Sequence, residues 1–563
     1  MILFTGLVSS LGVYAQQSEL HIVTTGDVHG SYFNRPYVGN KTRTSLMSVK
    51  YYVDSLRAAV GPENGLLLDA GDCIQGDNAS YYFNYVAKSE PHIYPRLVKY
   101  MGYDVCTLGN HDIEAGHAVY DRVYKEMDAF GIPWLAGNAI KPDGTTYFPE
   151  YKVVEKGGRR ILVMGYNNAN IEGWLSPELW DGMTHASLVP LVRKRVRALK
   201  SRIKPDAVVV IVHSGTGAGD GSSLESQGLD IFRRLCGADI LVTAHDHRPA
   251  VVNDKKRSLV NGGARCGNVG HAVLGFNGRR VVSRHAEVVR MDKNIVDEAM
   301  VKYFDAEFEA VKAFTVRPVG WLDMPLRSRD AYVGMSDYIG LLHTVQLQAT
   351  GSDISIAAPL NFNGYVAEGQ VIYNDMFTIY PFENQLFVLE LSGRELKDLL
   401  EFSYDRWICT PGDHVLKITN APDPRTGTLR WSFVNRSYNF DSAAGINYTV
   451  DVTAPAGSRV NIASLADGSA FDPDAKYTVA MTSYRANGGG DLLTKGAGIP
   501  HAELASRVKA RYAEIREFVY KFISSHNVVD HALVDDRTLL GSWRFVPESV
   551  ADPLLKSDLE LVL

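Results

Sequence analysis

Five short polar segments in the first half of the chain carry side chains of the types that bind metal ions. They are residues 26–29, 71–72, 109–112, 212–214 and 244–247, and each follows an apolar or β-branched run typical of a strand. A residue that directly follows a strand lies at the carboxyl edge of its sheet, where open α/β sheets bind ligands. Aspartate, asparagine and histidine gathered at that edge can surround a pair of divalent cations. The pattern therefore predicts a hydrolytic metalloenzyme.

The order and chemistry of these segments resemble those of the calcineurin-like metallophosphoesterases, and more narrowly the secreted 5′-nucleotidase and 2′,3′-cyclic-nucleotide 2′-phosphodiesterase family. Motifs at 372–375, 380–384, 391–393 and 484–491 extend the resemblance to residues 20–525. It implies an α/β fold with a four-layer α-β-β-α metallophosphoesterase sandwich over residues 19–291. A linker helix over 292–318 would join it to a smaller α+β substrate-binding domain of the 5′-nucleotidase C-terminal type over 319–525. We assign no function to the tail, 526–563.

The resemblance also implies which side chains hold the two metal ions. One ion would be held by Asp27, His29, Asp72 and His247, and the other by Asp72, Asn110, His213 and His245. Asp72 is the natural bridge, because a carboxylate offers two oxygens. This mixture of imidazole and oxygen ligands suits Zn²⁺, Mn²⁺ or a similar ion. Many 5′-nucleotidases carry an amide where His247 stands, so the preferred metal stays open.

The residue after the ligand asparagine, His111, takes the role of catalytic histidine by resemblance. It would stabilise charge on the phosphoryl oxygen or protonate the leaving alkoxide. An aspartate three residues later orients this histidine in 5′-nucleotidases. Glu114 occupies that position here and can still accept the imidazole N–H, although a solvated loop carboxylate is the alternative and Asp112 is an adjacent candidate. The implied reaction is in-line attack of metal-bound water on phosphorus, with no serine or cysteine nucleophile.

Recognition of the nucleobase is expected from the second half of the chain. Two aromatic rings can sandwich a base, and the family places one in a Pro-Phe-type motif and one just before a Gly-Gly motif. Phe382 and Tyr484 hold these positions here, and Asp491 stands near that of a ribose-binding carboxylate. Both rings could instead be core residues, but the turn-rich residues 487–490 favour an exposed loop. Because both rings come from the second domain, we expect the site to close between domains.

The ester that is cut depends on a segment of the second half. The 5′-nucleotidase branch usually carries an Asn-Gly-Gly-Gly-x-Arg-like segment whose arginine binds phosphate, whereas the corresponding residues 357–364 contain no arginine. Together with residues 438–441 and 484–486, this looks more like the 2′,3′-cyclic-nucleotide phosphodiesterase/3′-nucleotidase branch. Two alternatives remain, namely a phosphoesterase for a non-nucleotide ester and a catalytically inactive nucleotide-binding protein.

Composition agrees with a two-domain globular protein. The chain has 563 residues, of which 45% are hydrophobic and 22% charged. Its net charge of −6 creates no general field for nucleic acid, so the expected partner is a small nucleotide rather than a duplex. The oligomeric state cannot be derived from these numbers. Five scattered cysteines are too few for a disulfide framework, and Cys106 and Cys236 are predicted to be small buried hydrophobes.

The N-terminus is typical of a secretion signal. Residues 2–13 are apolar, and residues 13–15 offer small side chains for cleavage, although no basic residue precedes the apolar run. We therefore predict a signal peptide over residues 1–18, with the mature chain beginning near Gln16 and working in the periplasm or outside the cell. About twelve apolar residues cannot span a bilayer, so stable membrane insertion is not expected.

Hydrophobic periodicity predicts several elements outside the five segments. Residues 46–60 and 189–203 show helical spacing, and the first is ended by Gly61-Pro62 before a strand that starts near Gly65. Residues 292–314 are predicted to form one helix, 420–424 a turn cluster and 448–452 a strand. Residues 543–546 are predicted to be an edge strand or a docking segment.

Overall fold

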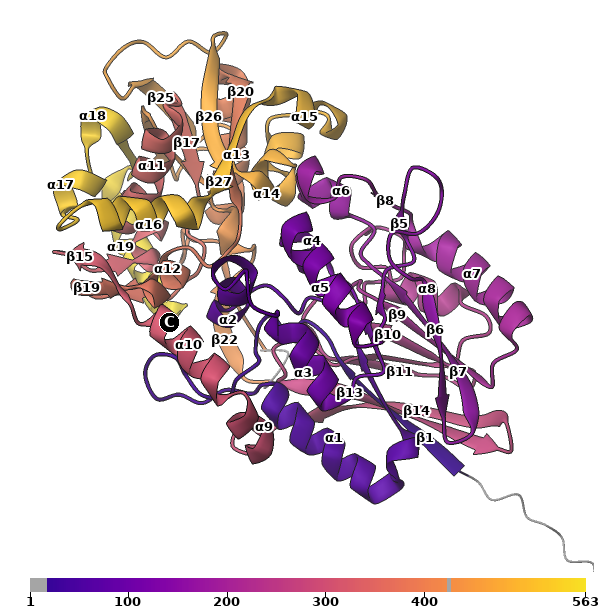
Figure 1. Cartoon of the computed structure of the whole chain (residues 1–563). Helices are drawn as coiled ribbons and strands as arrows, with labels where there is room; N and C mark the ends of the chain where they lie inside the picture. The colour runs from indigo at the N-terminus through magenta and orange to yellow at the C-terminus, as the bar shows by residue number, and fades with distance from the viewer. Residues whose placement is uncertain (1–17, 423–426, 563) are drawn as a thin grey trace, which may run out of the picture. The chain divides into compact units, whose positions relative to one another are not determined.

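A computed structural model describes residues 18–422 and 427–562 (Figure 1). The chain divides into two compact units. The first contains the residues up to Ile171 together with Glu178–Phe308, and the second contains Glu172–Pro177 together with Glu309–Leu563. The predicted signal peptide falls on residues 1–17, which lie outside the described residues.

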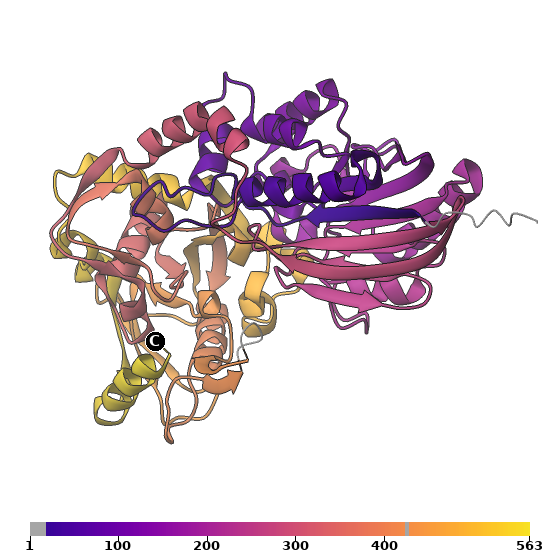
Figure 2. The same ribbon diagram turned by 90° about the horizontal axis from the view of Figure 1, so that it is seen from below.

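Two six-stranded sheets form the centre of the first unit. In the first sheet β1 (Ser18–Thr25), β2 (Gly65–Asp69), β3 (Val105–Thr107) and β4 (Trp134–Leu135) run parallel. The antiparallel strands β13 (Asn268–Asn277) and β14 (Arg280–Arg290) extend its edge and lie side by side in Figure 2.

The second sheet has the order β11-β12-β10-β9-β7-β6. Its parallel strands are β7 (Arg159–Tyr166), β9 (Ala207–Val212), β10 (Ile240–Thr243) and β12 (Ser258–Asn261). Strands β6 (Tyr151–Lys156) and β11 (Ala250–Asn253) pair antiparallel at its two edges.

The two sheets pack face to face and are covered by helices. One buried cluster joins Ile22 and Leu68 of the first sheet to Val209 and Val242 of the second. On the outer face of the second sheet, α7 (Leu188–Ile203) and α8 (Gly228–Arg234) pack through residues such as Val196. Helix α1 (Leu46–Val60) packs on β2, and α5 (His117–Ala129) packs on β4. The predicted four-layer α-β-β-α sandwich is therefore confirmed.

Local signals set the bounds of α1 as predicted. The hydroxyl of Ser45 accepts the Met47 N–H at 3.2 Å, which caps the helix. Gly61 ends it with φ at 88°, a left-handed value that glycine adopts without strain. Pro62 then prevents continuation, and β2 starts at Gly65.

Two predictions for the first unit need correction. The single helix predicted over 292–314 is two helices, α9 (Glu298–Tyr303) and α10 (Asp305–Thr315), because the backbone at Phe304 leaves helical geometry with ψ at 21°. Cys236 is exposed rather than buried, since it follows the end of α8 and precedes β10. Cys106 is buried as predicted, and all five cysteines are free thiols.

The second unit is an α+β domain built on a five-stranded sheet, as predicted. The order is β23 (Ser442–Ala444), β17 (Ile354–Ala357), β26 (Lys476–Thr482), β20 (Gln385–Ser392) and β27 (Val508–Glu514). Helix α13 (Gly393–Trp407) contributes Tyr404 and Trp407 to a core rich in aromatic rings. Large buried rings supply most of the apolar area that such a core removes from water.

The tail joins this unit rather than standing apart. Residues 543–546 lie in β28 (Gly541–Val546), which pairs with β24 (Ile446–Asp451) at the edge of a three-stranded sheet completed by β25 (Val460–Leu465). The edge-strand alternative is therefore confirmed.

The predicted turn at 420–424 is partly wrong, because β21 (Ile418–Pro422) continues through Pro422 as a strand of a two-stranded ribbon. Residues 423 and 424 lie outside the described residues. Within the described ranges, no helix is long and apolar enough to cross a bilayer.

Candidate metal centre and nucleotide site

The five polar segments converge because their strands end at the same edge of the sandwich. β1, β2 and β3 are parallel neighbours, with Thr25 opposite Asp69 and Asp69 opposite Cys106. β9 and β10 are parallel neighbours in the second sheet, with Thr243 opposite Val212. Since the sheets pack face to face, the residues that follow these ends meet over one edge.

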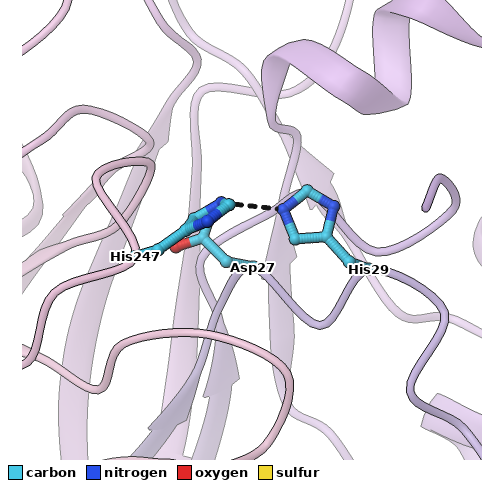
Figure 3. Close-up of side chains that lie close together, drawn as sticks. All are labelled: Asp27, His29 and His247. Atoms are coloured by element: carbon cyan, nitrogen blue, oxygen red, sulfur yellow. Dashed lines mark hydrogen bonds and ion pairs between the residues drawn. The ribbon is translucent and has the colours of Figure 1, made fainter. Parts of the chain in front are cut away.

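One group of potential ligands consists of Asp27, His29 and His247 (Figure 3). The Nε2 atoms of His29 and His247 lie 2.9 Å apart, and His247 Nε2 lies 3.6 Å from Asp27 Oδ1. The His29 ring is oriented by the contact of its Nδ1 with Gln75 O at 3.3 Å, which leaves Nε2 toward the centre of the group.

A second group consists of Asp72, His213 and His245. His213 Nε2 lies 3.0 Å from Asp72 Oδ2, and its Nδ1 contacts Ala70 O at 2.7 Å. Asn110 joins the group through its Oδ1 atom, 2.9 Å from His245 Nδ1. The structure thus brings the seven predicted side chains into two groups, with Asp72 in the second group only, whereas the resemblance implies that it belongs to both.

Asp72 acts electrostatically on both groups. Burial lowers the pKa of His29 well below its usual value, and the negative charge of Asp72 is the largest influence opposing that shift. Burial likewise disfavours the imidazolium of His213, but Asp72, Asp27 and the carbonyl of Ala70 together outweigh it and raise the pKa of His213 to about 9. The charge of Asp72 therefore acts on histidines of both groups.

The backbone at the site is held in an uncommon conformation. Five of the potential ligands have positive φ: Asp27 at 49°, His29 at 46°, Asp72 at 59°, His245 at 78° and His247 at 56°. Left-handed backbone is uncommon for residues other than glycine and is concentrated at functional sites, where the surrounding structure enforces it.

The buried polar atoms at the centre fit a pair of cations. Asp72 Oδ2 and His213 Nε2 are fully buried and lie 3.0 Å from each other, so each is the polar partner of the other within the described residues. Burial raises the pKa of Asp27 to about 8, with His213 opposing and Asp72 adding to the shift. The pKa values of Asp27 and His213 are both raised in this buried cluster of carboxylates and imidazoles, where divalent cations would compensate the negative charge.

His111 lies beside these groups and is held from two sides. Its backbone N–H donates to Asp72 Oδ1 at 2.8 Å, and its ring lies edge-on to that of His29 with centroids 5.3 Å apart. Its Nδ1 atom is in hydrogen-bond contact with Glu114 Oε2. Because Nδ1 is engaged by this carboxylate, a substrate would contact His111 through Nε2.

Asp112, the adjacent carboxylate, has a different role. It accepts the backbone N–H groups of Asp72, Cys73, Ile74 and Gly109 at 2.8–3.0 Å. It therefore holds the Asp72 loop against α4 (Asn110–Glu114) instead of orienting the histidine ring.

Three aromatic rings gather in the second unit. Phe382 lies in the loop before β20, and Tyr484 lies in α14 (Ser483–Ala486) after β26. The ring of Tyr438 contacts both, with centroids 6.3 Å from Phe382 and 6.4 Å from Tyr484. Phe382 and Tyr438 are each 37% exposed, so this cluster is open to solvent rather than part of the core.

Comparison with known proteins assigns both units. The calcineurin-like phosphoesterase family matches residues 20–249, and the 5′-nucleotidase C-terminal domain matches residues 318–495. The chain joins a calcineurin-like phosphoesterase domain to a 5′-nucleotidase C-terminal domain. It is accordingly a metal-dependent hydrolase.

Relatives span most of the chain. A 2′,3′-cyclic-nucleotide 2′-phosphodiesterase/3′-nucleotidase from Salmonella typhimurium is 25% identical over 88% of this chain and 84% of its own length. A 5′-nucleotidase from Vibrio vulnificus is 23% identical over 68% of this chain and 75% of its own. A putative 5′-nucleotidase from Staphylococcus aureus shares the fold, with 21% identity, a TM-score of 0.77 and coverage of 94% of this chain and 100% of its own.

Two buried arginines hold the aromatic loops of the C-terminal domain, and neither was predicted. Arg485 donates to both oxygens of Asp441 at 3.2 and 2.7 Å and to Tyr438 O at 3.2 Å. Arg516 donates to Tyr380 O and Phe382 O, both at 2.9 Å. Arg516 and its partners are distant in sequence and carry no motif, whereas Arg485 and Asp441 lie in the motifs at 484–486 and 438–441, which do not reveal that the two residues pair. Tyr438 could have been found, because residues 438–441 form one of the motifs used to choose the family branch.

The structure gives weaker support to Asp491. Its carboxylate lies 3.0 Å from Lys495 Nζ, one helical turn away, and its side chain is 39% exposed. Its φ of 65° follows two further turn residues of positive φ, Gly488 and Gly490. A ribose would have to compete with Lys495 for this carboxylate.

The segment that lacks an arginine follows β17. Arg329, from another part of the domain, donates to Asn363 Oδ1 at 2.5 Å and lies over the Phe362 ring at 5.0 Å. A guanidinium therefore lies beside this segment in the fold, although none is present in its sequence.

Proposed function

We propose that this hydrolase cleaves phosphate esters of nucleotides, using two divalent cations held at the carboxyl edge of the phosphoesterase domain. The observation that supports it best is the pair of ligand groups, with the buried Asp72 Oδ2 and His213 Nε2 lying 3.0 Å apart in the second group and the charge of Asp72 acting on His29 and His247 of the first. The Salmonella relative, named for cyclic-nucleotide and 3′-nucleotide hydrolysis, supports the choice of substrate.

The bound cations, His111 and Glu114 would have different roles in the reaction. Bound cations would supply charge stabilisation at the phosphoryl oxygens and a water of lowered pKa. Glu114 holds His111 Nδ1, so that Nε2 can donate to a phosphoryl oxygen or to the leaving alkoxide. The backbone contact of His111 with Asp72 ties the position of this ring to the ligand groups.

Phe382 and Tyr484 are proposed to hold the base, with Tyr438 beside both rings. Stacking is worth about 1–3 kcal/mol for each base contact and does not depend on base identity. Arg485 and Arg516 fix the loops that present these rings, which lowers the entropy lost on binding. Asp491 is a proposed ribose contact.

Removing the ring of Phe382 or of Tyr484 should weaken the binding of nucleotides. Phe382→Ala or Tyr484→Ala should raise KM for nucleotides by about 10-fold, the equivalent of one lost stack, with a small change in kcat. KM for 4-nitrophenyl phosphate should change less than about 2-fold, because this substrate has no base to stack. Steady-state kinetics on both substrates measure the difference. Equal losses on both would mean that the rings support the fold and do not bind the base.

The ester preference is proposed to follow the 2′,3′-cyclic-nucleotide branch. A monoester dianion gains more from an added guanidinium than a cyclic diester monoanion does, so the arginine missing from residues 357–364 should cost 5′-monophosphates most. We expect kcat/KM for 2′,3′-cyclic AMP and 3′-AMP to be at least comparable to that for 5′-AMP. Phosphate release is measured with Zn²⁺, Mn²⁺ or Co²⁺ and with a chelator, and chromatography of the 3′-AMP formed from 2′,3′-cyclic AMP follows the diester step.

The same panel tests the alternatives. Hydrolysis of 5′-AMP without any cleavage of the cyclic diester would contradict the branch but not the nucleotidase assignment. Faster hydrolysis of sugar phosphates than of every nucleotide would favour the non-nucleotide ester. Nucleotide binding without metal-dependent turnover would indicate an inactive binding protein.

Export is part of the proposal. The apolar residues 2–13 precede the first described strand, which starts at Ser18. In a diderm host the chain should appear in the periplasmic fraction with its N-terminus near Gln16, which mass spectrometry of the purified protein measures. Recovery in the cytoplasm with Met1 retained would contradict export.

A further inference from the structure

A cavity lined by basic side chains lies in the phosphoesterase unit, away from the ligand groups. Its volume is about 970 Å³. It is formed by the last turn of α7 and the residues after it, the turn before β10, the β11–β12 turn, and the β13–β14 turn with the first residues of β14. Six basic side chains line it: Lys200, Lys255, Lys256, Arg279, Arg280 and Arg284.

This cavity lies at the opposite end of the strands from the metal ligands. Asp206 and Asp239, which line it, directly precede β9 and β10, whereas His213 and His245 follow these strands. Six residues of extended chain from Ala207 to His213 span about 20 Å. The cavity is therefore separate from the proposed catalytic edge.

The two acidic residues of the cavity hold arginines in place. Arg279 donates through Nε and Nη2 to Asp206 at 2.7 and 3.0 Å, and Arg284 donates through the same two groups to Asp239 Oδ1 at 2.8 and 2.5 Å. Each carboxylate also accepts a backbone N–H, from Arg160 and Val208 respectively. The Nη1 group of each arginine can therefore donate to another acceptor.

The other basic residues leave an excess of positive charge. Lys255, Lys256 and Arg280 are exposed, and no described residue forms an ion pair or side-chain hydrogen bond with them. Six cations face two carboxylates, so the cavity is strongly positive in a chain of net charge −6. Like charges gathered at this density repel each other and favour binding of an anion that carries several charges.

We propose that this cavity binds a linear oligophosphate, an anion of three or more linked phosphate groups. The lining contains no aromatic ring, so the stacking by which proteins hold single-stranded nucleic acid is missing. The cavity is larger than one phosphate group requires, and its volume lies at the upper end of the range for small-molecule sites. Lysine ammonium groups act as mobile point charges, and the two fixed guanidiniums add directional donors for phosphate oxygens.

Calorimetric titration with tripolyphosphate tests the proposal on the full-length, metal-loaded protein. The variant Lys255→Gln/Lys256→Gln/Arg280→Gln should bind at least about 10-fold more weakly, and the slope of log K against log salt should shrink by about one for each cation removed. The matched control Lys88→Gln/Lys125→Gln/Lys293→Gln removes the same charge from exposed positions of the same unit and should stay within about 2-fold of wild type. Metal content, melting temperature and nucleotide turnover should be equal in all three proteins.

Each opposite result overturns the site. Equal weakening in the control would show a general charge effect. Tripolyphosphate binding that the cavity variant leaves unchanged and that 5′-AMP displaces would locate the anion at the metal edge. Orthophosphate binding as tightly as tripolyphosphate would exclude a site for linked phosphates, and tighter binding of an oligoribonucleotide of equal charge would indicate nucleic acid.

Discussion

Asp72→Ala should leave the protein without either metal ion. The carboxylate lies in the second ligand group, 3.0 Å from His213 Nε2, and its charge also acts on His29 and His247 of the first. Loss of the shared anion therefore removes a ligand from both sites. Turnover should fall by at least about 10³-fold, the equivalent of about 4 kcal/mol of lost transition-state stabilisation. Elemental analysis of gel-filtered protein and phosphate release measure the two effects.

A matched variant separates charge from shape at this position. Asp72→Asn keeps the size of the side chain and can keep the acceptor for the His111 N–H, but loses the negative charge. It should also be depleted of metal, with circular dichroism unchanged. Two tightly bound ions in Asp72→Ala would show that another group bridges them.

His111→Ala should separate metal binding from turnover. The substitution keeps the backbone N–H that donates to Asp72 Oδ1, so the ligand groups should keep their geometry and both ions. The imidazole that would donate to the phosphoryl or leaving oxygen is lost, which should lower kcat by about 10²–10⁴-fold. Metal content and kcat are measured on the same preparation.

A substitution of Glu114 tests whether this carboxylate positions His111. Glu114→Gln can still contact Nδ1 but lacks the charge, and should lower kcat by about 10-fold with KM and metal content unchanged. Loss of one ion per chain in His111→Ala would make His111 a ligand. Full activity of Glu114→Gln would mean that Glu114 is a solvated loop carboxylate that does not position His111.

Much of the phosphoesterase domain could be predicted because its signals are local. Each potential ligand lies within a few residues of the end of a strand that its apolar residues specify, as Asp27 does after β1 and His213 after β9. Ser45 and Gly61 bound α1 through their own backbone and side-chain preferences. Register and packing of parallel strands then bring these separate ends together, as the family resemblance implied.

The exposure of Cys236 and the break in the predicted helix depend on the tertiary structure and were not predicted from the sequence. Cys236 lies next to apolar residues in sequence but in an exposed turn of the fold. Residues 292–314 keep one apolar stripe, yet the backbone breaks at Phe304. A pattern of residue types reports which face is buried but does not report where tertiary packing bends or exposes the chain.

The sequence by itself predicted which side chains could be metal ligands, the strands that precede them and the two candidate base-binding rings, Phe382 and Tyr484. Only the tertiary structure placed Tyr438 against both rings and buried Arg485 and Arg516 behind their loops. It also gathered the basic cavity from α7, β14 and the turns beside them. The physical reason is that ligand type and strand pattern are encoded within a few residues. Contacts between residues tens to hundreds of positions apart exist only after the sheets have packed and the loops have closed over them.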